Sequence, residues 1–228
     1  MNVIGTKWIY KNKFDEKGIK APRGWYERLT EYLVNNGYRK GGTEKTLFVK
    51  EENGKLMIAQ IYVDGIVFGG MSNQIVQHFV RKIQFEFEMS LVGELTYFLG
   101  LQVKQMDGII FISQSKYAKS IVNKFGMEKA SHKSTPAPTH LKLTKDEKGV
   151  NLDQRLYRSM IGSLLYLTAN RLDMTFVVGV CVRYQSEPKM SHIIQVKRIL
   201  KYINGTSDYG ILYSHNANFL LIGYYDAD

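Results

Sequence analysis

One hairpin of the sequence carries the residues best suited to chemistry. Asp64 and Gly65 separate an apolar run that ends at Val63 from another that begins at Ile66, and an Asp-Gly pair in this position predicts a tight turn between two strands. A carboxylate at such a turn can bind a divalent cation, but Asp and Gly are also common in turns simply because they tolerate positive φ. A single carboxylate holds Mg²⁺ weakly, because this ion keeps most of its waters unless several oxygen ligands converge.

The other reactive residue types show no arrangement of a recognisable catalytic or metal site. The one cysteine, Cys181, lies within an apolar run, and we expect it to fill the core of a protein in a reducing compartment. The histidines lack the short, regular spacing of zinc ligands: His78, His132, His140, His192 and His215. His192 is expected at the surface or as a helix cap. No local motif supports a Ser/His/Asp or Cys/His triad.

Basic residues form the second functional signal. The 228 residues include 31 Lys and Arg against 21 Asp and Glu, a formal net charge of +10. Such a surplus favours polyanionic partners, either nucleic acid or an anionic membrane surface. Residues 113–148 hold eight Lys against three acidic residues, and residues 183–201 hold five basic residues against one acidic residue. Either segment can equally be an ordinary solvated face.

Hydropathy argues against a membrane-spanning protein. No uncharged apolar run approaches the roughly 18 residues that a span requires, because Arg171 and Arg183 interrupt the best candidates. Residues 1–8 show no basic region followed by an apolar stretch and a cleavage site, so no secretory signal is predicted. We therefore expect an intracellular protein, in the cytoplasm or the nucleus.

The elements around the hairpin mix strands and helices, which predicts an α+β fold. Runs of β-branched and aromatic residues predict strands, and apolar residues at every third or fourth position predict helices. The expected strands are 7–14, 47–50, 55–63, 66–69, 95–104, 109–113, 209–213 and 219–225. The expected helices are 25–36, 73–88, 113–126, 156–170, 173–184 and 191–203. Residues 127–153, with two prolines and few large apolar side chains, predict a linker.

Several blocks of the sequence resemble, in the same order, the reverse transcriptase of Ty1/copia-type retrotransposon Pol polyproteins. Ile61–Gly69 resembles the hairpin that carries Tyr-Val-Asp-Asp in that family, Ala21–Tyr26 resembles its Ala-Pro-Arg-Ala-Trp-Tyr motif, and Tyr97–Leu101 resembles its primer-grip strand. The further matching blocks are Tyr157–Leu167, Lys197–Tyr202 and Gly223–Asp228. The resemblance implies an RNA-directed DNA polymerase with a palm and a mostly helical thumb and connection region.

Two departures from the family concern the catalytic carboxylates. Gly65 stands where the family has the second Asp of its hairpin. A long segment that the family carries between the equivalents of Lys20 and Ala21, including the palm strand with the first catalytic Asp, is absent here. Nucleotidyl transfer needs two divalent ions about 3.5–4 Å apart, both held by carboxylates. The resemblance implies Mg²⁺ as the cofactor, and Asp64, the residual catalytic and metal-binding residue, would hold it weakly at best.

The resemblance also implies nucleic-acid-binding residues and domain limits. Contacts to the template and primer backbone require mainly positive charge. The expected nucleic-acid-binding residues are Arg23, Trp25, Tyr26, Tyr62, Leu99, Gly100, Lys116, Lys119, Lys197, Arg198 and Lys201. We expect a residual fingers hairpin at 1–20, a truncated palm and the start of the thumb at 21–126, a linker at 127–153, a helical connection region at 154–214 and the first strand of a missing ribonuclease H domain at 215–228.

Three hypotheses about function stay open at this point. The chain is a catalytically inactive remnant of the polymerase, a non-catalytic basic nucleic-acid-binding module, or a translated relic that does not fold stably. Salt-dependent binding without turnover separates the first two, and a cooperative unfolding transition tests the third. The absent palm strand should also leave an exposed sheet edge beside Ile58–Phe68, so self-association through that edge is expected.

Overall fold

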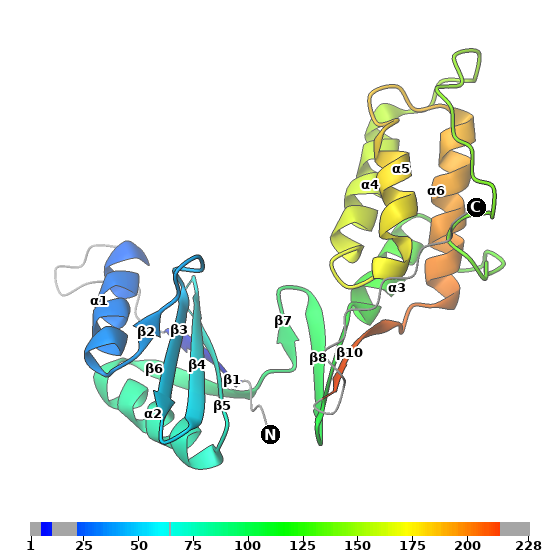
Figure 1. Ribbon diagram of the computed structural model, residues 1–228. Coiled ribbons are helices and arrows are strands. Elements are labelled where there is room, and N and C mark those ends of the chain that lie inside the picture. Colours follow the sequence, from blue (N-terminus) through cyan, green and yellow to red (C-terminus); the bar gives the residue numbers. More distant parts are fainter. Residues whose placement is uncertain (1–5, 11–21, 64, 215–228) are drawn as a thin grey trace. The chain divides into compact units, whose positions relative to one another are not determined.

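The computed structural model describes residues 6–10, 22–63 and 65–214 of the chain. These residues belong to two compact units (Figure 1). The first unit holds the described residues up to Thr96 together with Met106–Gly108, and the second holds Tyr97–Gln105 and Ile109–Ser214. No helix among these residues has both the length and the apolar character that a membrane crossing requires.

The first unit is built on a six-stranded sheet in which every pair of neighbouring strands is antiparallel. Its strands, in spatial order, are β2 (Arg39–Lys40), β3 (Leu47–Glu52), β4 (Lys55–Tyr62), β5 (Gly65–Gly70), β1 (Thr6–Tyr10) and β6 (Met89–Glu94). Two helices, α1 (Pro22–Asn35) and α2 (Asn73–Glu86), cover one face of this sheet (Figure 1). The mixture of helices with antiparallel sheets confirms the α+β class.

Local sequence patterns explain the core of the first unit. Along β4 every second side chain is buried, as period-two alternation requires when one face of a sheet is covered. The apolar face of α2 packs against that layer through Val76, Phe79, Val80 and Ile83. The hydroxyl of Ser72 caps the helix by accepting a hydrogen bond from the backbone N–H of Ile75 at 3.5 Å.

The edge of β5 that was expected to be exposed is paired. β1 lies against it, with Trp8 opposite Ile66 and Ile9 opposite Gly65, and the other side of β1 pairs with β6. Thr6–Tyr10, expected in a residual fingers hairpin, is thus an interior strand of the sheet. Self-association through an open β5 edge is therefore not supported, because the hydrogen-bonding groups of that edge already have a partner strand.

The turn between β4 and β5 differs by one residue from the Asp-Gly turn that the sequence predicts. Tyr62 pairs with Gly65, so Gly65 is the first residue of β5 and is buried there. Val63 adopts a φ of 52°, a left-handed conformation that β-branched residues rarely adopt. Asp64 lies outside the described residues.

The second unit combines a four-stranded sheet with a helical layer. The strands, in spatial order, are β10 (Gly210–Ser214), β9 (Ile109–Ser113), β8 (Leu101–Met106) and β7 (Tyr97–Phe98). The helices are α3 (Ser115–Lys124), α4 (Gln154–Leu167), η1 (Leu172–Met174), α5 (Thr175–Val182) and α6 (Met190–Gly205). β10 pairs with β9, whereas the second strand expected at 219–225 lies outside the described residues.

The helices of the second unit share one apolar core. Its largest fully buried side chains include Tyr157, Leu164 and Met174, and the hydroxyl of Tyr157 donates to the carbonyl of Cys181 at 2.9 Å. Cys181 is fully buried, as expected for a core-filling thiol. The carboxylate of Asp153 caps α4 by accepting from the N–H of Arg155 at 2.8 Å.

Residues 127–153, expected to be a linker between domains, form an extended arm along α6 (Figure 1). Hydrogen bonds tie the arm to the helix in antiparallel order. The side chain of Asn204 donates to the carbonyl of Met127, that of Gln195 donates to Pro136, and the ring of His192 bonds Thr144. The arm also contributes partly buried apolar residues to the core: Met127, Ala137, Leu141, Leu143 and Leu152. The whole arm belongs to the second unit.

His192 is a helix cap, one of the two roles expected from the sequence, but it is buried rather than at the surface. Its Nδ1 accepts the backbone N–H of Lys189 at 3.0 Å at the start of α6, while its Nε2 lies 2.8 Å from the carbonyl oxygen of Thr144. The ring is fully buried and stacks on Tyr184 with centroids 4.1 Å apart. This histidine therefore fastens the arm to the first turn of α6.

Candidate functional site

The hairpin that resembles the catalytic one of the family is formed by β4 and β5, and the strand beside it is β1. The sequence of β1 is Thr-Lys-Trp-Ile-Tyr, which contains no carboxylate. Among the described residues there is no group of three or more His, Cys, Asp or Glu side chains that could hold a metal ion. The residues present therefore do not fit a pair of divalent ions at this hairpin, because neither Gly65 nor β1 supplies a carboxylate.

The aromatic residues expected to bind nucleic acid near this hairpin contribute to the first unit itself. The hydroxyl of Tyr26 donates to the carbonyl of Lys45 at 2.8 Å, and the ammonium of Lys40 lies 5.2 Å from the centre of its ring. Trp25 is partly buried against the core. Tyr62, at the end of β4, is exposed. The side chain of Arg23 lies outside the described residues.

The segment that resembles the primer grip is a two-residue turn between β7 and β8. Leu99 has a φ of 51° and Gly100 a φ of 80°, so both central residues are left-handed, as in a type I′ hairpin. Leu99 is exposed. A side chain at Gly100 would collide with the hydroxyl of Tyr166, so glycine is required here by both conformation and space.

Tyr166 of α4 anchors this turn to the helical layer. Its hydroxyl donates to the carbonyl of Leu99 at 2.6 Å, and its ring meets that of Tyr117 edge-on, with centroids 4.8 Å apart. Gln114 donates to the Tyr166 carbonyl at 3.2 Å. The sequence placed Tyr166 in a matching block but gave it no role, since only the fold brings it to Leu99.

Some of the basic residues of α6 lie on an exposed face of the helix. Lys197 is exposed and Lys201 half-buried one turn later on the same side of the helix. The backbone N–H of Lys133, on the arm, donates to the carbonyl of Lys201 at 3.4 Å, which brings a third lysine to this surface. We call Lys133, Lys197 and Lys201 the α6 basic face.

Two other basic residues of the segment 183–201 already bind partners within the protein. Arg198 is half-buried and donates to the hydroxyl of Thr135 at 2.9 Å. Lys189, which the sequence placed in the same basic cluster, is only 4% exposed. Its ammonium binds Glu187 at 2.8 Å and Asn151 at 2.7 Å. Lys189 is therefore a structural residue rather than part of a binding surface.

The lysines of α3 are exposed, but one of them is paired. Lys116 stands at the start of the helix, and its backbone N–H donates to Gln102 of β8 at 2.7 Å. Lys119 forms an ion pair with Asp208 at 3.0 Å. Exposed pairs of this kind contribute little energy, so Lys119 can exchange its carboxylate for a phosphate at small cost.

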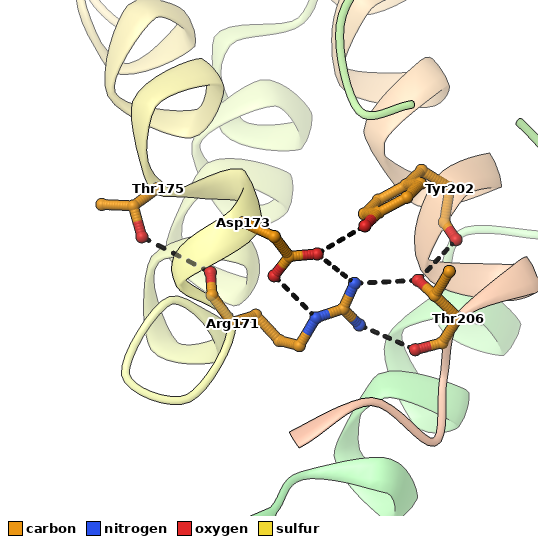
Figure 2. A network of polar contacts seen from close by, with 5 residues as sticks. All are labelled: Arg171, Asp173, Thr175, Tyr202 and Thr206. Carbon is orange, nitrogen blue, oxygen red and sulfur yellow. Dashed lines mark hydrogen bonds and ion pairs between the residues drawn. The ribbon is translucent and has the colours of Figure 1, made fainter. Parts of the chain in front are cut away.

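One polar network in the second unit was not predicted from the sequence. Figure 2 shows Arg171, only 2% exposed, gripping both oxygens of Asp173 at 2.9 and 2.7 Å. The same guanidinium donates to the carbonyl and the hydroxyl of Thr206, each at 2.8 Å, while the hydroxyl of Tyr202 donates to Asp173 at 2.6 Å. The sequence held one sign of this network: Arg171 interrupts an apolar run, and Asp173 follows it two positions later.

The network fixes η1 to the end of α6 and shifts the pKa of its carboxylate. Burial would raise the pKa of Asp173, but the hydrogen bonds from Arg171 and Tyr202 and the guanidinium charge outweigh it, so that pKa lies below its usual value. A guanidinium bound to the carbonyl of the C-cap residue, Thr206, also complements the negative end of the α6 dipole. We assign the network a structural role and call Arg171, Asp173, Tyr202 and Thr206 the Arg171 clasp.

The comparisons with known proteins agree with the resemblance of the sequence blocks. Residues 17–139 match the family model described as "Reverse transcriptase (RNA-dependent DNA polymerase)". The chain is 31% identical over 212 residues to the "Retrovirus-related Pol polyprotein from transposon RE2" of Arabidopsis thaliana, an alignment that covers 92% of this chain and 15% of the polyprotein. It is 30% identical to the Pol polyprotein from transposon RE1 of the same plant, over 92% of this chain and 14% of that protein.

A shorter relative is similar over most of its own length. An uncharacterised mitochondrial protein of Arabidopsis thaliana is 33% identical over 173 residues, which is 75% of this chain and 71% of that protein. No solved structure matches the chain. The chain spans about 15% of the length of the transposon RE2 Pol polyprotein, and it belongs to the reverse transcriptase family of copia-type retrotransposon Pol polyproteins.

Proposed function

We propose that this chain is a reverse-transcriptase remnant that does not extend primers. The observation that carries the proposal is the identity of the strand beside the catalytic hairpin. By family resemblance, the strand with the first catalytic Asp should lie there, next to β5. β1 occupies that position with the residues Thr-Lys-Trp-Ile-Tyr. The family generally uses Mg²⁺, and here neither β1 nor Gly65 supplies a carboxylate to hold it.

Primer extension by the purified chain tests this proposal. A labelled primer annealed to an RNA or DNA template is incubated with all four dNTPs and either Mg²⁺ or Mn²⁺. We expect no extension above a protein-free control. Template-dependent extension that disappears in an Asp64→Ala variant would overturn the proposal, because it would show that another carboxylate has taken the vacant catalytic role.

A second function, non-specific binding of nucleic acid, is supported by the α6 basic face. Lys197 is exposed, and the arm places Lys133 beside Lys201. Contacts between lysines and phosphates need no catalytic geometry, so this binding does not depend on the missing carboxylates. Lys116, Lys119 and the turn at Leu99–Gly100 extend the proposed surface within the second unit.

The salt dependence of binding tests this second function. For duplex DNA, the logarithm of affinity should fall linearly with the logarithm of salt, with a slope of about −0.9 per phosphate neutralised. Changing Lys197 and Lys201 together to Ala removes two such contacts, so the slope should become shallower by about 1.8. Arg198 is left intact in this variant because its hydrogen bond to Thr135 holds the arm.

A matched control uses two exposed lysines elsewhere on the arm, Lys142 and Lys148. Changing both to Ala lowers the net charge by the same amount without touching the α6 basic face. We expect a smaller change in slope for this control pair. Equal effects of the two double variants would mean that net charge alone drives binding, and no binding even at low salt would remove this function.

A further inference from the structure

The helix α5 is apolar on every side, yet it is buried on only one. Its residues are Thr-Phe-Val-Val-Gly-Val-Cys-Val. Helices with this character are usually enclosed on all sides. Val177, Val178 and Cys181 enter the core of the second unit, whereas Phe176 is 79% exposed and Leu172, one turn earlier, is 70% exposed.

The exposed side of α5 carries a large side chain, Phe176, and a glycine with open space beside it. Gly179 lies three residues after Phe176, and a Cβ added there would meet no atom within 4 Å. Residues three apart lie on the same side of a helix. Leu165, on the neighbouring helix α4, is also exposed. We call Leu165, Leu172, Phe176 and Gly179 the α5 face.

We propose that the α5 face binds the same face of a second copy of this chain, with the two α5 helices antiparallel. A two-fold axis reverses the helix direction, so positions pair when their residue numbers have a constant sum. Phe176 of each copy then lies over Gly179 of the other, so each ring occupies the open space beside the glycine of the other copy. Self-complementary contacts of this kind characterise symmetric dimers.

The charges at the two ends of α5 fit the same arrangement. Asp173 precedes the helix and Arg183 follows it. In the antiparallel pairing Arg183 lies opposite Leu172 of the other copy, one residue from Asp173, so the guanidinium of one copy comes close to the carboxylate of the other. The side chain of Asp173 is 36% exposed. A carboxylate has about four acceptor positions, so it can receive a second guanidinium in addition to Arg171. A parallel arrangement would instead place like charges together.

A second copy suits this face better than nucleic acid does. The face is apolar at its centre, and its flanking charges balance each other, whereas nucleic acid requires a surplus of positive charge. Burial of exposed aromatic side chains at the centre of an interface, with complementary charges at the rim, is the usual arrangement of protein–protein contacts.

The oligomeric state of the full chain tests the proposal. In sedimentation equilibrium the unmodified protein should show a monomer–dimer equilibrium that depends on concentration. Phe176→Lys and, separately, Arg183→Glu should each weaken the dimer, the first by at least about tenfold because a central aromatic anchor is lost. Ile194→Lys is the matched control, since this exposed residue of α6 lies outside the α5 face. The thermal unfolding of each variant checks that it is folded.

Cross-linking tests the antiparallel orientation directly. Phe176→Cys protein is mixed with Gly179→Cys protein, and a short bifunctional maleimide is added. Cys181 stays unmodified because it is buried and burial raises the pKa of its thiol to about 12. The mixture should give more cross-linked dimer than either variant alone.

Three results would overturn the proposal. The first is a chain that is monomeric at every concentration, and the second is a dimer unaffected by both Phe176→Lys and Arg183→Glu. The third is a loss of nucleic-acid binding in Phe176→Lys without any dimer in the unmodified protein, which would assign the face to nucleic acid instead.

Discussion

Val63 has a conformation that its residue type disfavours. Its φ of 52° places a β-branched side chain in the left-handed region, at the end of the hairpin that resembles the catalytic one. The pairing of β5 with β4 and β1 fixes the register, with Tyr62 opposite Gly65 and Ile9 opposite the same glycine. A shift of this register by one residue would turn every side chain of β5 to the other face of the sheet. The strand pairing therefore holds Val63 in its strained left-handed conformation.

Replacing Val63 with Asn should therefore stabilise the chain. Asn tolerates the left-handed region, and Val63 is 70% exposed, so little packing is lost. We expect the free energy of unfolding to rise by about 1 kcal/mol in urea titrations. Val92→Asn, at an exposed position within β6, is the matched control and should be neutral or destabilising. A similar loss of stability in both variants would mean that Val63 is not strained.

The Arg171 clasp makes stability depend on acidity. The pKa of Asp173 is lower in the folded chain than in the unfolded one, so the carboxylate stabilises the fold above its unfolded pKa of about 3.9. That contribution is lost as the pH falls through the lower, folded pKa. Stability should thus decline on acidification below about pH 4.

Asp173→Asn should remove this pH-dependent contribution. At neutral pH we expect the variant to be less stable by roughly 2 kcal/mol, less than for a fully buried pair because about a third of Asp173 is exposed. The difference from the unmodified chain should shrink as urea titrations are repeated at lower pH. Asp208→Asn, at a mostly exposed ion pair, should show little effect. An unchanged difference at acidic pH would contradict the account of the clasp.

The sequence predicted the positions of the helices better than the pairing of the strands. The helices α1, α2 and α6 lie within a few residues of their expected bounds, because their apolar spacing is set within each segment. The place of β1 was not predictable, since strand pairing between distant residues leaves no local trace. The arm was expected to be a linker because its apolar residues are sparse, and only the fold shows that they pack against the core of the second unit.

The candidate site shows the same limit. The sequence suggested the hairpin residues and the basic segments as candidates, but it did not show that Lys189 is buried or that Tyr166 bonds Leu99. Burial and contacts between distant residues follow from the packing of the helices, which a single sequence does not specify.

The structure predicts that β1 protects the sheet from aggregation. Trp8 is paired on both sides, with Ile66 of β5 and Leu91 of β6. Trp8→Pro removes a backbone donor from an interior strand and should open the β5 edge. We expect increased light scattering on incubation and a lower unfolding midpoint. Lys40→Pro, in the terminal strand β2, should have a weaker effect. Equal aggregation of the two variants would argue that β1 does not cover the sheet.

For the whole molecule, two separate apolar cores support independent folding of both units. Cys181 reports on the second core because its thiol is fully buried. In native buffer we expect it to resist thiol reagents, and its labelling in urea should follow the loss of helical circular dichroism. Rapid labelling without denaturant would instead support the hypothesis of a relic that does not fold stably.

We attribute the proposed inactivity to the absence of a whole carboxylate-bearing strand beside the hairpin, rather than to the absence of one side chain. Primer extension by the Gly65→Asp variant, with Mg²⁺ and with Mn²⁺, distinguishes these two explanations. The variant restores one ligand next to Asp64 but leaves β1 without a carboxylate, and partial repair of a catalytic unit returns little activity. We predict no extension above the unmodified chain. Template-dependent and dNTP-dependent extension by the variant would contradict the account.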